Sequence, residues 1–428
     1  MKHRPAAVAL VAALASGLLA MTTTAAAAPP PTASTVAATD SEEATRDKIE
    51  LTLERSADRL VRAKETQLSR AESSSQDSPE LAGTRSTDSA AGALAAAATT
   101  SRIFGINRYD TAVKISQNTF TKPASDFGGV VFVTNGMNFP DALSAGPAAA
   151  SLVGPILLVP PTGGLPPVVE TEIQRLDPLS VVILGGTDNV SAQAEAELKV
   201  LVPEPNAVFR TAGTNRYKTS ALLSDFVAKA VDLGGGAWDF TEPDTAIIST
   251  GLSFADALAG GAAGGWEYAP LLLTATGGLD AAIIDVLTPI PADPGTGYPG
   301  RTFKTVRILG SAATVSTTVE NQIKAILPSA NVVRYAGADR FDTAAKLNAA
   351  VFTAPAYEVT LVNGFRFPDA LAGAPRVNAT GGPTVPVRTE CVPAFSKSTL
   401  TTLTPAFVTA LGNVDAVSNA ALAGTQCP

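Results

Sequence analysis

The sequence predicts an α/β protein of three tandem Rossmann-like or flavodoxin-like repeats, preceded by a helical or disordered N-terminal segment. From residue 101 onward, short runs of Val, Ile and Leu alternate with helical segments, which indicates parallel sheets covered on both faces. One ordered set of short motifs occurs three times in this region. The composition agrees, since 46% of the 428 residues are hydrophobic, 16% are charged and 6% are aromatic, which is typical of compact modules rather than disorder.

Residues 1–28 have the composition of a secretory signal peptide. Lys2 and Arg4 precede an apolar run over residues 6–21, and small residues follow at 25–28. The apolar run is shorter than the roughly 20 residues that span a bilayer. We therefore expect a leader that is removed rather than retained as an anchor, and a secreted protein with no membrane association after its removal.

Residues 29–100 are expected to form a helical spacer and a flexible linker. Asp40 and Glu43 have the spacing of a capping box that opens a charged helix. Ile49, Leu53 and Leu60 share one face of this helix. We interpret it as a solvated spacer, with a partner-binding or coiled segment as the alternative. The remainder of the region is rich in Ser, Ala and Thr and is expected to be a linker.

Four motifs define the repeat. The first runs Gly-x-[Asn/Asp]-Arg-[Tyr/Phe]-x-Thr and begins at Gly105, Gly213 and Gly337. The second is a glycine five residues before an Asp-Ala-Leu sequence, with the pairs Gly136 and Asp141, Gly251 and Asp256, and Gly364 and Asp369. The third is an apolar strand that begins at Pro155 and Pro270, and the fourth is a Leu-Gly turn at Gly185, Gly310 and, more weakly, Gly412. The repeats are therefore expected at residues 101–206, 207–330 and 331–428.

The second repeat shows the expected order of elements most clearly. Strands are predicted at residues 207–210, 245–249, 271–274 and 306–309. Helices are predicted at 217–231, 254–264, 280–287 and 317–327. Two insertions rich in Gly, Pro and aromatic residues, 234–240 and 291–301, are expected to be loops.

Residue counts exclude several classes of function. The only histidine is His3, inside the expected leader, so the mature chain lacks the side chain needed for Ser-His-Asp catalysis or for His-ligated zinc. The formal charge of −8 argues against a general affinity for nucleic acid. Cys391 and Cys427 suit an oxidising compartment and could close a terminal loop as a disulfide.

The ordered motifs resemble the cell wall binding repeat type 2 family of secreted and surface-layer-associated proteins of Gram-positive bacteria. The resemblance covers residues 101 to 428. It implies three repeats packed around a pseudo-threefold axis, and noncovalent attachment to the envelope through anionic secondary wall polymers. In the third repeat the apolar strand reads Pro-Thr-Val-Pro and the cysteine pair is added, so we expect this repeat to act as a cap that binds poorly.

The recurring arginines Arg108, Arg216 and Arg340 are the candidate ligand contacts. Each is predicted between a strand end and a helix start, where ligands of open α/β sheets bind, and a guanidinium there would hold phosphate or carboxylate groups. Pairing of each arginine with a recurring aspartate is the structural alternative. The preceding residues Asn107, Asn215 and Asp339 are weaker ligand candidates, since they also suit helix capping.

The recurring aspartates Asp141, Asp256 and Asp369 are assigned to helix starts or salt bridges rather than catalysis. Each repeat offers one recurring carboxylate and not the pair that glycoside cleavage requires. The glycine pairs after the strands lack the Lys-Ser/Thr of a phosphate-binding loop. We therefore predict no enzyme activity, no cofactor and no metal site.

The function predicted from the sequence is noncovalent binding of an exported protein to an anionic wall polymer, through three weak sites that act together. The protein is expected to be secreted and retained at the cell surface. A structural or adhesive surface protein that packs against other proteins is the first alternative, and a carboxylate-based wall glycan hydrolase is the second. The sequence makes no prediction of oligomeric state.

Overall fold

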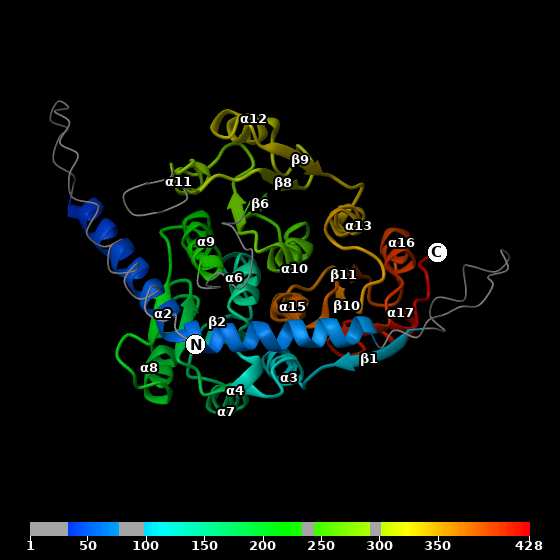
Figure 1. The fold of residues 1–428 in the computed structure, drawn as a ribbon, viewed down its shortest axis with the longest axis horizontal. Coiled ribbons are helices and arrows are strands. Elements are labelled where there is room, and N and C mark those ends of the chain that lie inside the picture. Colours follow the sequence, from blue (N-terminus) through cyan, green and yellow to red (C-terminus); the bar gives the residue numbers. More distant parts are fainter. Residues whose placement is uncertain (1–32, 77–97, 233–243, 292–300) are drawn as a thin grey trace, which may run out of the picture.

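The computed structural model describes residues 33–76, 98–232, 244–291 and 301–428, which form three four-stranded parallel sheets arranged as a ring (Figure 1). The α/β fold class and the three repeats are confirmed. In the second repeat the observed elements follow the predicted order, and their ends differ from the predicted ones by three residues or fewer. The expected leader lies outside the described residues, as do most of the linker and nearly all of both insertions.

Each repeat contributes three strands to its own sheet, together with the helices that cover them. The first repeat contains β2 (Val130–Asn135), β3 (Ile156–Val159), β4 (Ser180–Leu184), α3 (Arg108–Thr119), α4 (Pro123–Asp126), α5 (Pro140–Leu143), α6 (Ala145–Ser151), α7 (Pro167–Leu176) and α8 (Ala192–Leu201). The second contains β6 (Thr245–Thr250), β7 (Leu271–Thr274), β8 (Thr305–Leu309), α9 (Arg216–Asp232), α10 (Ala257–Glu267), α11 (Ala281–Leu287) and α12 (Thr317–Ile326). The third contains β10 (Glu358–Asn363), β11 (Thr384–Val387), β12 (Phe407–Leu411), α13 (Arg340–Val351), α14 (Pro368–Gly373), the 3₁₀ helix η1 (Ala374–Arg376), α15 (Val377–Thr380), α16 (Ala394–Leu403) and α17 (Asn419–Leu422).

The fourth strand of each sheet comes from the beginning of the next repeat. Strand β5 (Val208–Thr211) pairs with β4, and β9 (Asn331–Tyr335) pairs with β8. Strand β1 (Thr99–Ile103) closes the ring, because it pairs in parallel with β12 at the other end of the chain. Each sheet therefore joins two repeats, and a division of the chain by sheets differs by one strand from a division by sequence repeats.

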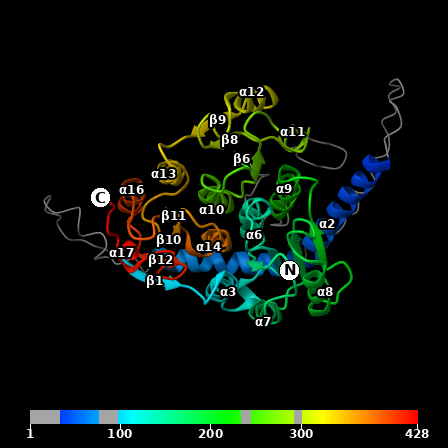
Figure 2. The same cartoon turned by 180° about the vertical axis from the view of Figure 1, so that it is seen from behind.

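Small residues bring the three repeats together at the centre of the ring. Figure 2 shows α6, α10 and α14 grouped there. A Cβ atom added to Gly146 of α6 would lie 3.0 Å from the Cβ of Ala374 and 3.1 Å from the Cα of Gly261 in α10. Larger side chains at these positions would push the repeats apart, which explains the small residues that follow each recurring aspartate.

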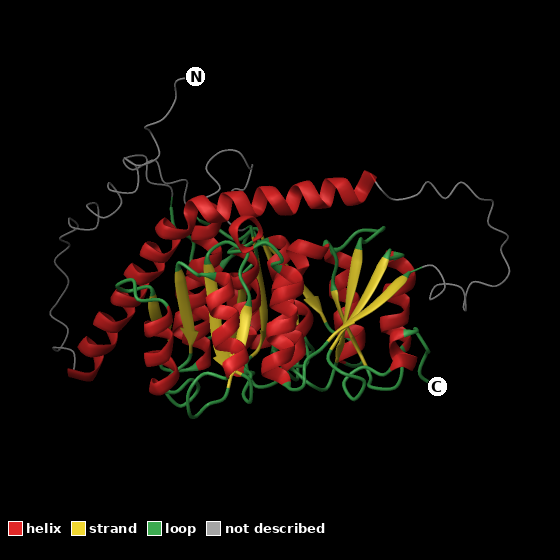
Figure 3. Cartoon of the chain, turned by 90° about the horizontal axis from the view of Figure 1, so that it is seen from below, coloured by secondary structure: helices red, strands yellow, loops and turns green. Residues whose placement is uncertain are grey.

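The ring has two faces, which we name by the ends of the strands that lie there. The carboxyl-end face carries the loops that follow β2, β6 and β10. The amino-end face carries the loops that precede the strands, and the helix α2 (Ala33–Gln76) lies across it (Figure 3). The described residues contain no helix that is both long and apolar enough to cross a membrane.

The solvated-spacer interpretation of α2 is wrong, because one side of the helix is packed against the ring. Ile49, Leu53 and Leu60 are 0–3% exposed. Arg55 and Arg59 each donate a hydrogen bond to a backbone carbonyl in loops before β5 and β4, at 2.9 Å and 2.6 Å. The helix is thus a cover for the amino-end face and contacts elements of all three repeats.

Candidate functional site

The first motif folds into the same local structure in each repeat. The backbone N–H of its glycine donates to the hydroxyl of its threonine at 3.1 Å, which closes the loop before α3, α9 and α13. The arginine begins the helix and is half-buried. Its Nη1 donates to the carbonyl of the second-motif glycine, with the pairs Arg108 and Gly136 at 2.6 Å, Arg216 and Gly251 at 2.5 Å, and Arg340 and Gly364 at 2.7 Å.

This single bond fixes each guanidinium at the carboxyl-end face and leaves donors for another group. A guanidinium carries five N–H donors. Within the described residues, the side chains of Arg108, Arg216 and Arg340 each make one hydrogen bond, and its acceptor is the glycine carbonyl. The arrangement holds the charged group in place while its remaining donors are still available to an anion.

The candidates that precede the arginines lie at the helix starts as caps. The side chain of Asn107 accepts hydrogen bonds from the backbone N–H groups of Tyr109 and Asp110, each at 3.0 Å. Asp339 makes the equivalent pair of bonds at 2.9 Å. Asn215 accepts from Lys218 at 2.8 Å and also donates to Asp280. These oxygens are therefore occupied by backbone groups, although the three side chains are exposed.

Each recurring aspartate lies at the boundary with the next repeat. Asp141 of the first repeat interacts with Thr219 and Arg216 of the second. Asp256 interacts in the same way with Thr343 and Arg340 of the third repeat. Asp369 of the third repeat interacts with Arg108 of the first, and so completes the cycle. None of the ion pairs found within 4.0 Å in the described part of the chain joins these arginines to these aspartates, so the arginines are not neutralised by direct contact.

Burial dominates the electrostatics of the three aspartates. It raises the pKa of Asp141 and of Asp256 above the ordinary value of 3.8, against the opposing effects of the neighbouring threonine and arginine. Burial also raises the pKa of Asp369, which the charges of Arg108 and Arg366 oppose. A carboxyl group with a raised pKa takes up a proton more readily as the pH falls. The loss of its negative charge would make the surroundings of the neighbouring arginine more positive, which favours an anionic ligand.

The Leu-Gly turn makes room for these carboxylates. Gly185, Gly310 and Gly412 have φ values of +84°, +102° and +96°, which side chains other than glycine rarely adopt. A Cβ atom at any of the three would lie 2.5–2.7 Å from an oxygen of the aspartate in the same repeat. The second and fourth motifs therefore meet within each repeat, beside the first motif of the next repeat, which explains why the three recur together.

Three phenylalanines mark the centre of the carboxyl-end face. Phe139, Phe254 and Phe367 each lie two residues before the recurring aspartate, and their ring centroids are 5.5, 5.7 and 5.7 Å apart. These phenylalanines recur in the sequence as part of the second motif, which is the signal that marks them, but no role was predicted for them. Their contact shows directly that the three repeats surround one axis.

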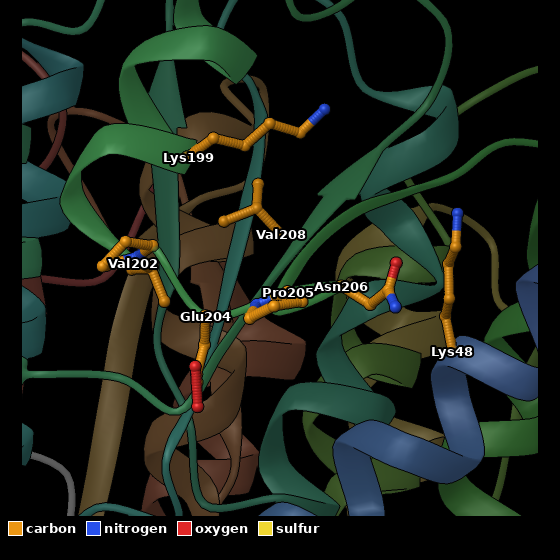
Figure 4. A pocket seen from close by; sticks show the side chains of 8 residues that line it. Lys48, Lys199, Val202, Glu204, Pro205, Asn206 and Val208 are labelled. Atoms are coloured by element: carbon orange, nitrogen blue, oxygen red, sulfur yellow. The ribbon is translucent and has the colours of Figure 1, made fainter.

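Two hollows among the described residues lie away from the three arginines. One has a volume of about 280 Å³ and lies between α2 and the loop that follows α8 (Figure 4). Its lining includes Lys48 of α2 and Lys199 of α8. The loop contributes Glu204, Pro205 and Asn206.

Comparison with known proteins identifies the family. The family described as Cell wall binding domain 2 (CWB2) matches residues 102–195, 210–320 and 334–422. The chain belongs to this family. A CWB2 protein of this kind binds the cell wall noncovalently, and the chain is a secreted protein of the Gram-positive cell surface.

Two curated proteins and two solved structures are similar to this CWB2 chain. A Bacillus subtilis (strain 168) protein named amidase enhancer is 31% identical over 301 residues, which cover 70% of this chain and 36% of that protein. The N-acetylmuramoyl-L-alanine amidase LytC of the same organism is 30% identical over 277 residues, which cover 64% and 47%. Cwp6 and Cwp8 from Clostridium difficile share the fold at 22% and 24% identity, each with a TM-score of 0.63, over 82% and 75% of this chain and about half of theirs. The CWB2 chain thus spans half or less of the length of the curated relatives it matches.

The third repeat has the two features that set it apart in the sequence, a cysteine pair and a proline-containing strand. Cys391 and Cys427 form a disulfide with an S–S distance of 2.01 Å, and it joins the residues after β11 to the end of the chain. Pro386 lies within β11, the edge strand of its sheet, where the missing N–H is tolerated. The departure from the apolar motif therefore leaves the strand in place.

Proposed function

We propose that the carboxyl-end face of the ring holds an anionic wall polymer, with Arg108, Arg216 and Arg340 as its direct contacts. The observation that carries this proposal is the repeated geometry, in which a half-buried guanidinium is fixed by one glycine carbonyl and keeps its other donors. Arginine forks match phosphate and carboxylate groups. Three such groups around one axis would bind a polymer with avidity, even if each contact is weak.

The side chains around the arginines favour binding of a polymer that has apolar as well as charged groups. The residue after each second-motif glycine is a large apolar side chain that is half or more exposed: Met137, Leu252 and Phe365 are 57%, 60% and 50% exposed. Apolar side chains next to charged donors suit the faces and substituents of sugar rings. This pattern recurs three times, and so it is a property of the repeat rather than of one loop.

We further propose that the chain itself is a binding module without catalytic activity. Each recurring aspartate faces an arginine of the next repeat and the glycine of its own turn, and so is engaged in the packing of the ring. Two curated relatives have names that refer to an amidase, and they are about two or more times as long as the matched region. We infer that this chain serves the same wall-attachment role that such a region would serve in them.

Cosedimentation with purified wall sacculi tests the proposed function. Wild-type protein is expected to bind intact sacculi, to lose most of its binding after acid extraction of the anionic polymers, and to weaken as salt rises. The Arg108→Gln, Arg216→Gln, Arg340→Gln triple variant should bind at least 100-fold more weakly, since each lost charge-assisted bond contributes about 1.5–3 kcal/mol. Lys114→Gln, which removes one exposed charge of α3 outside the site, is the matched control. Binding that survives extraction of the polymers would contradict the proposal.

A further inference from the structure

The carboxyl end of the third sheet differs from those of the other two at equivalent positions. The strand registers pair Asn135 with Val159, Thr250 with Thr274, and Asn363 with Val387. The residues that follow are therefore equivalent in the three repeats. At these positions the first repeat has Met137, Asn138 and Pro160, the second has Leu252, Ser253 and Ala275, and the third has Phe365, Arg366 and Arg388.

The recurring Arg340 and the added Arg388 of the third repeat lie beside the same aromatic ring. The guanidinium carbon of Arg340 lies 4.6 Å from the centroid of the Phe365 ring, and that of Arg388 lies 5.6 Å from the same centroid. Arg340 also approaches Phe254 at 5.9 Å, and Arg388 approaches Phe341 at 5.7 Å. Stacking on aromatic faces limits the motion of a guanidinium without using its N–H donors. Two charged groups are thus held beside each other with most of their donors free.

A second difference lies at the opposite edge of the same sheet. Arg210 and Arg334, on the edge strands of the first two sheets, each bond a turn carbonyl and also a glutamate, Glu195 at 2.7 Å and Glu320 at 2.8 Å. Arg102 on β1 is the equivalent residue of the third sheet. It bonds the carbonyls of Gly412 and Asn413 and the side-chain oxygen of Asn419. Its contacts are therefore neutral, and no carboxylate lies within 4.0 Å of it in the described ranges of the chain.

The acidic side chains near this sheet form no close ion pair with these arginines among the described residues. Asp369 faces Arg366 and Arg108 across the repeat boundary, and its pKa is raised by burial. Glu390 and Asp415 are exposed, and Asp415 contacts Asn413. None of the ion pairs found within 4.0 Å among the described residues includes any of Arg102, Arg340, Arg366 or Arg388.

We infer that the third repeat is the principal anion site of the ring, and that Arg340 and Arg388 beside Phe365, together with the neighbouring Arg366, grip phosphate or carboxylate groups of the polymer, with Arg102 extending the site along the sheet edge. This inference rests on the proposed function. It reverses the expectation that the third repeat binds poorly. Adjacent parallel strands are about 4.8 Å apart, so Arg366 after β10 and Arg388 after β11 are placed side by side, which suits successive charges of a linear polyanion.

Single variants measured on the same wall sacculi test this assignment. Arg388→Gln and Arg366→Gln should each weaken binding about tenfold, and more than Arg216→Gln, whereas Lys114→Gln should have no effect. Arg366 and Arg388 are exposed, so these variants are expected to fold, which thermal unfolding checks. In the converse experiment, Asn138→Arg with Pro160→Arg places the third-repeat arginines in the first repeat and should tighten binding.

Soluble competitors identify the charged group. Poly(glycerol phosphate) should displace the protein if phosphate is recognised, and polygalacturonate should do so if carboxylate is. Wild-type binding that persists while Arg366→Gln and Arg388→Gln bind as well as wild type, and Arg216→Gln does not, would overturn the third-repeat assignment alone. A wild-type protein that does not bind polymer-bearing sacculi would overturn the proposed function as well.

Discussion

The two faces of the ring are built on different principles. The carboxyl-end face contains the same structure three times. Residues that recur in the sequence interact at each repeat boundary, as Arg216 does with Asp141. The amino-end face is covered once, by a single helix whose contacts differ from repeat to repeat. A repeated surface suits repeated contacts with a polymer, whereas a single cover breaks the symmetry and protects one face. We therefore assign binding to the carboxyl-end face and part of the stability to the amino-end face.

The largest effect is expected from loss of packing under the helix. Leu60 of α2 is 1% exposed and lies against Gly128. Leu60→Ala should cost about 3 kcal/mol in docking of the helix, as for other buried leucines. Proteolysis of α2 should become faster, while binding to sacculi stays unchanged. A solvated spacer would lose less than about 0.5 kcal/mol from the same change, and that result would contradict the cover assigned to α2.

The next effect belongs to the carboxyl-end face. Gly185→Ala places a Cβ atom at a φ of +84° and against the carboxylate of Asp141, and should lower the free energy of unfolding by about 1–2 kcal/mol. Gly186→Ala is the matched control, because nothing lies within 4 Å of its added Cβ. Urea unfolding of the two variants measures the difference. Equal stabilities would show that the close approach of Asp141 and the turn is unimportant.

A pH dependence of about 1 kcal/mol is expected from the amino-end face. Burial lowers the pKa of Lys64 in α2 from 10.5 to about 8. Between these values the unfolded chain binds more protons, so stability should rise from pH 8 to pH 9 by about 1 kcal/mol. Burial also raises the pKa of Tyr268, beneath Lys64, from 10.0 to about 12, which opposes the rise above pH 10. Lys64→Met should flatten the rise in urea unfolding between pH 8 and 9. A rise of the same size in that variant would mean that another group is responsible.

The smallest effect is a trend of opposite sign on the other face. The raised pKa values of Asp141, Asp256 and Asp369 mean that protons bind the folded chain more tightly, so the stability they contribute is full below pH 3.8 and is lost as pH rises through their folded values. As the pH falls toward that range, each neighbouring arginine loses an opposing charge, and affinity for a phosphate polymer should rise. The triple Asp→Asn variant should bind without this dependence and should unfold no more easily at neutral pH. Binding that weakens on acidification would contradict this coupling.

The sequence predicted what is local and repeated, and it failed where distant segments meet. The arginine motif and the order of strands and helices could be predicted because they depend on residues close in sequence. Gly105 and Thr111, for example, bond to each other around the start of α3 at Arg108. The pairing of β1 with β12 could not be predicted, because the strand carries no mark of which repeat it completes. The helix α2 was misjudged because its buried side includes Thr52, Ser56 and Lys64, which weaken the apolar pattern. The electrostatic interaction of Asp369 with Arg108 depends on closure of the ring and has no signal within either repeat.

Hydrogen exchange of the full chain, with and without bound poly(glycerol phosphate), tests most directly whether the polymer lies on the carboxyl-end face. Slower exchange is predicted in the segments 105–109, 213–217 and 337–341 and in the loops after β2, β6 and β10, with the strongest change around Phe365 to Arg366. The buried segment of α2, residues 45–67, should exchange at the same rate in both samples. Protection confined to α2 and the amino-end face, with no change at the three arginine segments, would contradict the account.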